Sequence, residues 1–392
     1  MWARISEVWK KTELGAREQT LTIWVFLRCL GLVYLVAFWS LGTQVLGLVG
    51  ENGLLPAGAF LRRVAQSAGA SAYWQVPTLC WLSSSDTTLI LLCVAGAAFA
   101  LALMAGVVPR LCLFACYVMY LSLASVCQDF LWFQWDSLLL EASFLSVFLA
   151  PMCVRQSLTA LRPPPVVGLY LLRWLIFRLM LASAAVKLTS GDPAWRDLTA
   201  LTFHYETQPL PSWTAWYAHL LPLGFQKASA LGMFAIEGPC AFLVFAPRRL
   251  RIAGALAFIF LQLLILGTGS YGFFNLLTIV LCIPLFDDRC WPRWLQQRAQ
   301  SSTQSQETVE GPSFSGRRRF ASLGAACILV WLSLVPLCGA LHCSTEWLGP
   351  AAPAVQELAP FRLINHYGLF AVMTTERQEL VSSHPETARA RK

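Results

Sequence analysis

Three basic side chains lie inside one long apolar segment, where they could take part in chemistry. Arg173, Arg178 and Lys187 all fall within residues 166–188, a stretch long enough to cross a bilayer. A charge at the middle of a membrane helix costs about 2.5–3.5 kcal/mol on insertion scales. These cations therefore need carboxylate partners or water, and a partly desolvated Lys187 amine could serve as a base or bind a substrate.

Carboxylates in other apolar segments can partner these cations. A helical rise of about 1.5 Å per residue places Arg178 and Glu237 near mid-depth, and Lys187 near the membrane face that also holds Glu141 and Asp136. The sequence predicts the pairs Arg178 with Glu237, and Lys187 with Glu141 or Asp136. Intramembrane ions usually pair inside the bundle, which favours structural locks between helices over a chemical role. The predicted intramembrane ionisable cluster is Glu141, Arg173, Arg178, Lys187 and Glu237.

Two loop segments carry aromatic and ionisable side chains on the same side of the membrane. One holds Trp132, Trp135 and Asp136, and the other holds Trp195, Phe203, His204, Tyr205 and Glu206. His204 and Glu206 could form an acid/base pair or supply two metal ligands. No third ligand has a zinc spacing, and neither HExxH nor CxxC occurs. We therefore predict no metal, and expect His204 to be satisfied by a hydrogen bond in a loop packed against the membrane rim.

The elements that must position these residues are membrane helices. Hydrophobic residues make up 57% of the chain and charged residues 13%, which is typical of membrane proteins. The composition and the regular apolar runs predict an all-α, polytopic transmembrane helical bundle of about nine spans. These runs cover residues 21–41, 87–108, 111–127, 138–153, 166–188, 227–245, 252–267, 273–286 and 320–341.

Basic residues predict the orientation of the bundle. Arg4, Lys10, Lys11 and Arg17 precede a first run that is too long for a signal-peptide core, which places the N-terminus in the cytosol. The later basic turns then all fall on the cytosolic side, and the C-terminus is lumenal. The expected organisation is a cytosolic N-terminus (1–20), a transmembrane domain (21–286) with lumenal loops 42–86, 128–137 and 189–226, a cytosolic polar linker (287–319), a last span (320–341) and a short lumenal tail (342–392).

Several functional classes are excluded by missing motifs. There is no Walker loop, dinucleotide-binding fingerprint or GxSxG motif, so no catalytic residue and no cofactor are predicted. The basic clusters face the membrane surface, where the lipid bilayer is a better partner than nucleic acid. Most of the 13 cysteines lie in apolar runs as small hydrophobic residues. Cys338 and Cys343 could pair with each other or with Cys80 in an oxidising lumen.

Seven segments resemble the lipase maturation factor family. The resemblance runs from the first span to Thr374, and it is carried by NGLLPA (52–57), PTLCWL (77–82), FQWDSLLLEASFL (133–145), RWLIFRLMLASAAVKLTS (173–190), AWRDLTALTFHYETQPLP (194–211), FFNLLT (273–278) and NHYGLFAVMT (365–374).

The resemblance implies a multi-pass protein of the endoplasmic reticulum membrane that helps secreted lipases, typified by lipoprotein lipase, to fold and assemble before export. Its expected partners are these client lipases and lumenal folding factors, and the family is not known as an enzyme. Family members continue past the NxYGLF motif into a substantial lumenal domain. Here a charged tail follows Thr374, so the resemblance implies a chain that lacks most of that domain.

Two other functions remain open from the sequence. A more distant likeness to the vitamin K-dependent carboxylase group implies a membrane enzyme with Lys187 as base on a lipid or quinone, with Glu141, His204 or Glu206 nearby. That alternative predicts an apolar cavity around Lys187. A transporter is less favoured because no internal repeat is evident. For a maturation factor, we expect Trp132, Trp135 and Phe203 to cover apolar surface on a folding client.

Overall fold

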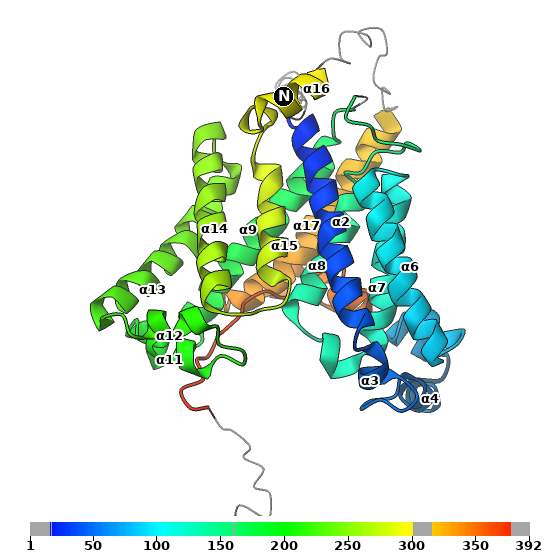
Figure 1. Ribbon diagram of the computed structural model, residues 1–392, viewed down its shortest axis with the longest axis horizontal. Coiled ribbons are helices and arrows are strands. Elements are labelled where there is room, and N and C mark those ends of the chain that lie inside the picture. The colour runs from blue at the N-terminus through cyan, green and yellow to red at the C-terminus, as the bar shows by residue number, and fades with distance from the viewer. Residues whose placement is uncertain (1–15, 17, 160, 301–315, 378–392) are drawn as a thin grey trace, which may run out of the picture.

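Helices are the dominant secondary structure of this computed structural model, whose described part comprises residues 16, 18–159, 161–300 and 316–377 (Figure 1). Within these ranges no β-strand occurs, only isolated bridges between Val107 and Arg155 and between Pro211 and Gly269. The predicted all-α bundle is therefore confirmed. The basic N-terminal residues 4, 10, 11 and 17, the middle of the predicted linker and the end of the predicted tail lie outside the described residues.

Seven helical segments of the described chain are long and apolar enough to cross a membrane. They are α2 (Thr20–Gly42), α6 (Asp86–Ala105), α7 (Pro109–Val126), α9 (Val166–Thr189), α13 (Leu223–Glu237) continued by η4 (Pro239–Phe245), α14 (Arg248–Thr268) and α17 (Gly316–Ala340). The bundle is thus a polytopic helical membrane domain, as predicted.

Two predicted spans form shorter helices. α8 (Gln134–Val147) has 14 residues, and α15 (Phe274–Cys282) with η5 (Ile283–Leu285) has 12. At about 1.5 Å per residue the longer one reaches only about 21 Å, whereas the hydrocarbon core is about 30 Å thick. Nine crossings therefore stay a prediction, since seven helices meet the length that a straight crossing needs.

The bundle has two ends, which we name after helices that mark them in Figure 1. The α16 end carries α16 (Arg293–Gln300), η6 (Asp288–Cys290) and the start of α2. The α12 end carries the short helices α11 (Ala200–Thr207) and α12 (Trp213–His219) and also the start of α13. The sequence predicts that the α16 end is cytosolic and the α12 end lumenal.

The remaining short elements lie in the connections. They are α3 (Val45–Val49), α4 (Ala57–Ala68), η1 (Gly69–Ser71), α5 (Ala72–Gln75), η2 (Leu79–Trp81), η3 (Gln128–Leu131), α10 (Pro193–Arg196), η8 (Glu346–Leu348), α18 (Ala351–Leu358) and η9 (Ala359–Phe361).

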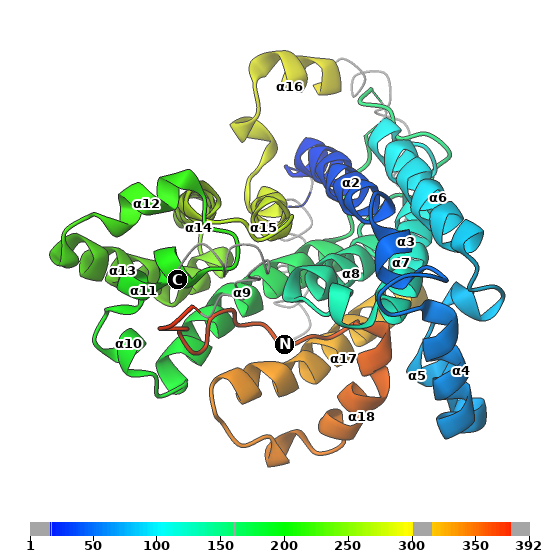
Figure 2. The same cartoon turned by 60° about the horizontal axis from the view of Figure 1, so that its bottom comes forward.

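Helix α9 is the central element, and it is the helix that carries the three cations. In its most apolar window 72% of the residues are buried, the highest share among the seven candidate spans. Figure 2 shows α9 running through the middle of the molecule, with α17 on one side and α14 and α15 on the other. The indole of Trp174 ties α9 to α17 by donating a hydrogen bond to Ser333 Oγ at 2.7 Å. A charge on α9 therefore faces protein rather than lipid.

Close packing of α2 against α6 depends on a glycine. A Cβ at Gly96 would overlap the ring of the buried Phe38 on α2, which no real side chain tolerates. Local signals delimit α6 itself. The hydroxyl of Ser85 accepts a hydrogen bond from the Thr88 N–H at the N-cap, and Gly106, with a φ of 77°, ends the helix in the left-handed conformation.

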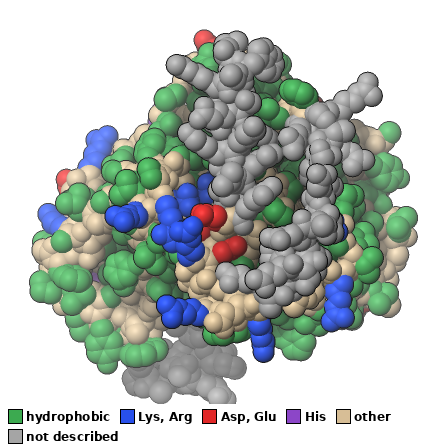
Figure 3. Space-filling view, turned by 90° about the horizontal axis from the view of Figure 1, so that it is seen from above, with side chains coloured by type: hydrophobic (Ala, Val, Ile, Leu, Met, Phe, Trp, Pro, Cys, Tyr) green, Lys and Arg blue, Asp and Glu red, His purple; other side chains and the backbone are tan. Residues whose placement is uncertain are grey.

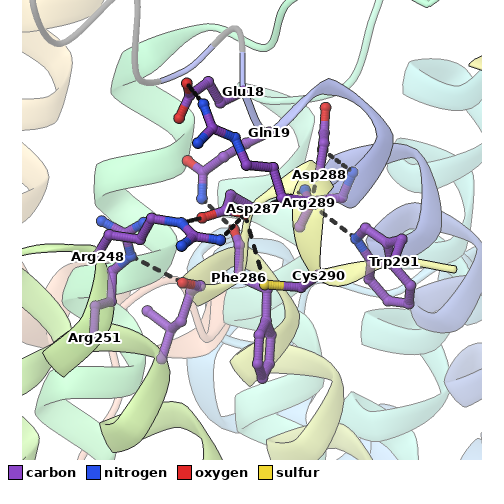
Figure 4. Close-up of polar contacts among 12 residues, drawn as sticks. Glu18, Gln19, Arg248, Arg251, Phe286, Asp287, Asp288, Arg289, Cys290 and Trp291 are labelled. Carbon is purple, nitrogen blue, oxygen red and sulfur yellow. Dashed lines mark hydrogen bonds and ion pairs between the residues drawn. The ribbon is translucent and has the colours of Figure 1, made fainter. Parts of the chain in front are cut away.

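Polar contacts at the α16 end join three helices that are far apart in the sequence (Figure 4). The Asp288 carboxylate accepts hydrogen bonds from the N–H groups of Leu21 and Thr22 at 3.1 and 2.8 Å, and so caps α2 from a distant part of the chain. Arg248, at the start of α14, forms an ion pair with Asp287. Figure 3 shows basic side chains gathered around acidic ones on this face.

A segment near the C-terminus closes the α12 end. Residues 361–373, which we call the strap, begin at the last residue of η9 and run back across this end of the bundle (Figure 1). Tyr117 of α7 donates its hydroxyl to the Phe361 carbonyl at 2.7 Å, and the Met373 N–H donates to Asp192 Oδ2 at 2.6 Å. The strap thus bridges α7 on one side of the bundle to the start of α10 on the other.

Candidate functional site

The strap brings Asn365 and Tyr367 onto a buried ion pair between α8 and α9. Arg178 Nη2 and Glu141 Oε1 form the pair, and their side chains are 3% and 1% exposed. The second carboxylate oxygen of Glu141 accepts hydrogen bonds from the Asn365 N–H, the Asn365 Nδ2 and the Tyr367 hydroxyl, at 3.0, 2.9 and 2.7 Å. The Arg178 guanidinium also lies 5.6 Å from the centre of the Tyr367 ring. We call these four residues the Glu141 node.

The second cation of α9 pairs with a carboxylate of α13. Lys187 Nζ lies 2.7 Å from Glu237 Oε2, and the two side chains are 4% and 8% exposed. The ammonium is 5.6 Å from the centre of the Trp195 ring, and the Trp195 indole donates to the strap carbonyl of Phe370 at 2.9 Å. This ion pair therefore lies between α9, α13, α10 and the strap.

The predicted pairing of these charges is wrong, because Arg178 pairs with Glu141 and Lys187 with Glu237. Helix α8 begins at Gln134, so Glu141 lies two turns inside the helix, level with Arg178 rather than with Lys187. Helix α13 runs obliquely in Figure 1, so each of its residues advances along the bundle axis by less than the full helical rise. Glu237 consequently ends α13 beside Lys187. Asp136, the other predicted partner of Lys187, is fully buried and accepts the Tyr120 hydroxyl at 2.6 Å.

Arg173 belongs to neither ion pair. It lies at the α16 end, where its Nη2 donates to Gln19 Oε1 at 2.9 Å and its guanidinium lies 5.3 Å from the centre of the Tyr170 ring. A neutral amide and an aromatic face therefore stabilise this buried cation. The five predicted ionisable residues thus form two ion pairs and one separate site rather than a single cluster.

His204 joins a hydrogen-bonded chain that ties α11 to the turn before α15. The Tyr271 hydroxyl donates to Gln208 Oε1 at 2.9 Å and lies 3.0 Å from His204 Nε2. Because that hydroxyl has one proton, His204 Nε2 must be the donor in the second contact. Burial and the charge of Lys187 lower the pKa of His204 to about 4, while burial raises the pKa of Tyr271 to about 12. Both groups are therefore neutral at pH 7.

Glu206 points away from His204 and has a different partner. Its Oε1 lies 2.7 Å from Nε2 of His219 on α12, and its side chain is largely exposed. The acid/base or metal-ligand pair of His204 and Glu206, which the sequence left open as an alternative, is therefore not formed. Across the described ranges no three His, Cys, Asp or Glu side chains are grouped so that they could hold a metal ion.

The predicted aromatic residues divide into exposed and packed ones. Trp132 is 77% exposed, and the centre of its ring lies 5.2 Å from the Arg362 guanidinium carbon. Trp135 stacks on Phe133 with ring centres 4.4 Å apart. Trp195 is buried, Phe203 packs beside it, and Tyr205 is half-buried next to His204. Trp132 is therefore the predicted aromatic most available to a partner.

Lys187 lines neither of the two best-formed cavities among the described residues. The two best-formed cavities are lined instead by residues around Arg178, and the larger has a volume of about 10 Å³, enough for at most one water molecule. Neither cavity is the apolar chamber beside Lys187 that an enzyme acting on a lipid or quinone would need.

All 13 cysteines are free thiols, including Cys80, Cys338 and Cys343.

The main residues that sequence reasoning missed are those of the strap. Asn365 and Tyr367 were visible as polar residues in the NHYGLFAVMT segment, but Glu141 lies 224 residues before Asn365. Tyr271 and Gln208 were missed in the same way, since their contact spans 63 residues. A polar residue inside an apolar segment was the available signal, and it carried no information about the partner.

Comparison with known proteins gives a consistent result. The model of the lipase maturation factor transmembrane domain matches residues 21–293. Lipase maturation factor 2 of Gallus gallus is 47% identical over 283 residues, which are 69% of this chain and 39% of that protein. The human lipase maturation factor 2 is 40% identical over 330 residues, covering 79% and 44%. Lipase maturation factor 1 of Bos taurus is 34% identical over 399 residues, covering 96% and 69%.

The coverage of these relatives is uneven. The chain spans about two fifths of the length of the lipase maturation factor 2 relatives that it matches. No solved structure matches.

Proposed function

Because this chain belongs to the lipase maturation factor family, we propose that it assists the folding, assembly and secretion of lipases of the lipoprotein lipase class at the endoplasmic reticulum membrane. The family match to residues 21–293 carries the proposal. The proposed topology places residues 21–286 and 320–341 in the membrane part, and residues 1–20 and 287–319 in the cytosol. Loops 42–86, 128–137 and 189–226, with the tail 342–392, lie in the lumen.

The role that we propose for the buried charges is mechanical. The buried charges of α8, α9 and α13 include two ion pairs between helices, Arg178 with Glu141 and Lys187 with Glu237. The strap supplies further hydrogen-bond donors to Glu141. A paired, desolvated charge fixes the relative positions of its helices, because leaving either partner alone is costly. The bundle then acts as a rigid platform that presents its α12 end to a client and to lumenal folding factors.

The client surface that we propose centres on Trp132 and Phe133. Both rings are exposed, and Arg362 of the strap supports Trp132. Exposed aromatic patches are typical interaction sites. Trp132→Ser with Phe133→Ser should lower the secreted lipase activity while the abundance of the factor is unchanged. Phe203→Ser is the contrasting variant, because this packed ring should lower abundance first.

A non-catalytic helper is the form of the proposal that the geometry favours. Lys187, the candidate base, is paired with Glu237 at 2.7 Å and lines neither of the two best-formed cavities among the described residues. A base must reach the proton that it removes.

The test is rescue of lipase secretion in cells that lack endogenous maturation factors. Two proteins are compared at matched abundance: this chain, and this chain joined to the C-terminal part of a full-length lipase maturation factor 2. An empty vector is the control. The proposal predicts that the joined protein, at least, restores the activity of secreted lipoprotein lipase. If both proteins reach the endoplasmic reticulum membrane and neither restores activity, the proposed function is wrong.

A further inference from the structure

Helix α12 presents its apolar face away from the protein. Trp213, Trp216, Tyr217 and Leu220 follow the i, i+3, i+4, i+7 spacing of one helical face, and all four are exposed, Trp213 at 78%. The opposite side packs inward, with Ala215 fully buried and His219 paired with Glu206 of α11. A helix at a water-facing surface normally turns its polar side chains outward and packs its apolar side chains against the protein. The surroundings of this face, which we call the α12 aromatic face, must therefore be apolar.

The start of α12 lies at the level where α14 ends. The hydroxyls of Thr214 and Ser212 both donate to the carbonyl of Gly267, in the last turn of the candidate span α14. Pro211, just before α12, forms a β-bridge with Gly269, just after α14. Tryptophan and tyrosine concentrate at this level of membrane proteins, since their rings tolerate the mixed polarity of the headgroup region.

The α12 aromatic face continues into surface that faces lipid. Leu221, Leu223 and Phe225, in the turn after α12 and the start of α13, are exposed, as are Leu256 and Phe260 along α14. Only 28% of the most apolar window is buried in each of these two spans, the lowest share among the seven. The apolar surface therefore runs from the sides of α13 and α14 onto α12 without a change in chemistry.

We propose that α12 is an interfacial helix whose aromatic face lies in the headgroup region of the bilayer at the α12 end. Through this contact the membrane holds the connection between α9 and α13 in place. Gln226 of α13 donates to the carbonyls of His219 and Leu221 at 2.8 and 3.0 Å, and His219 pairs with Glu206. α11, α12 and α13 are therefore linked to one another by side-chain contacts. This inference does not rest on the proposed function.

A photo-cross-linker in place of Trp216 tests the inference directly in native membranes. With p-benzoylphenylalanine at this position of the full chain, irradiation should give protein that carries the added mass of one phospholipid. The matched control places the same group at Glu51, a charged and exposed residue of the connection between α3 and α4. The phospholipid adduct at position 216 should exceed the control several-fold. A predominant cross-link to a protein, a second copy included, would overturn the inference, and so would equal lipid adducts at both positions.

Fluorescence quenching by brominated lipids supplies a second readout. In vesicles of phosphatidylcholine brominated near the headgroup, the double variant Trp213→Phe with Trp216→Phe should lose part of the quenching seen in the unaltered chain. With lipids brominated deep in the acyl chain, the loss should be smaller. Unchanged quenching at both depths would place α12 in water and contradict the inference.

Discussion

The four residues of the Glu141 node make contacts of different strength, so we predict that variants at these positions lose different amounts of stability. Glu141→Gln keeps the shape of the side chain but leaves the Arg178 guanidinium, 3% exposed, without a counter-charge. Breaking one partner of a buried ion pair costs about 3–5 kcal/mol. Tyr367→Phe removes one hydrogen bond to a charged acceptor, which is worth about 1.5–3 kcal/mol. Asn365→Ala removes the Nδ2 donor at 2.9 Å while the backbone N–H still reaches Glu141.

The assay is the free energy of unfolding of the purified chain in mixed micelles, titrated with a denaturing detergent. We expect the loss to be largest for Glu141→Gln and smaller for Tyr367→Phe and Asn365→Ala. The double variant Glu141→Gln with Tyr367→Phe should lose less than the sum, because Glu141→Gln already removes the negative charge that strengthens the hydrogen bond from Tyr367. Tyr217→Phe is the matched control, since Tyr217 is exposed and its ring faces away from the bundle. A cost for Glu141→Gln no greater than that of the control would refute the reasoning.

Two further predictions concern packing and pH. Gly96→Ala should lower the free energy of unfolding by about 1–3 kcal/mol, because the new methyl group meets the ring of Phe38. The same change at Gly232, where no atom lies within 4 Å of the position that a Cβ would take, should cost nothing, and equal effects at the two sites would contradict the packing account. Because the pKa of His204 falls from 6.5 to about 4 on folding, its stabilising contribution is complete above pH 6.5 and is lost as the pH falls toward 4. His204→Gln should therefore make the melting temperature depend less on pH in this range. An unchanged dependence would show that His204 is not its cause.

The apolar runs predicted the helices well, because a membrane helix must satisfy its backbone internally and its length is set by the bilayer. The first run began one residue from the start of α2, and the cation-bearing run began at the first residue of α9. The two runs that became α8 and α15 with η5 formed helices of 14 and 12 residues, which are shorter than a straight crossing needs. Hydropathy counts apolar residues, and it does not show whether a helix is surrounded by protein or must reach both faces of the membrane.

The partners of the charges could not be predicted from depth alone. Depth counting assumes that each helix stands upright, whereas α13 is inclined and brings Glu237 to Lys187. The role of the strap was equally hidden, since Tyr367 meets Glu141 across 226 residues of chain. Buried side chains at such distances are brought together by tertiary packing, and no local pattern specifies that packing. The sequence therefore identified which residues needed partners but not which partners they have.

The central claim is that the buried charges lock the helices together, and a double-mutant cycle on Lys187 and Glu237 tests it most directly. Each single change to Met should cost about 3–5 kcal/mol of unfolding free energy, because it leaves the other charge buried and unpaired. The double variant should recover most of that loss, since two apolar side chains of similar volume can replace the pair. Strictly additive losses, or a Lys187→Met variant as stable as the unaltered chain, would contradict the account.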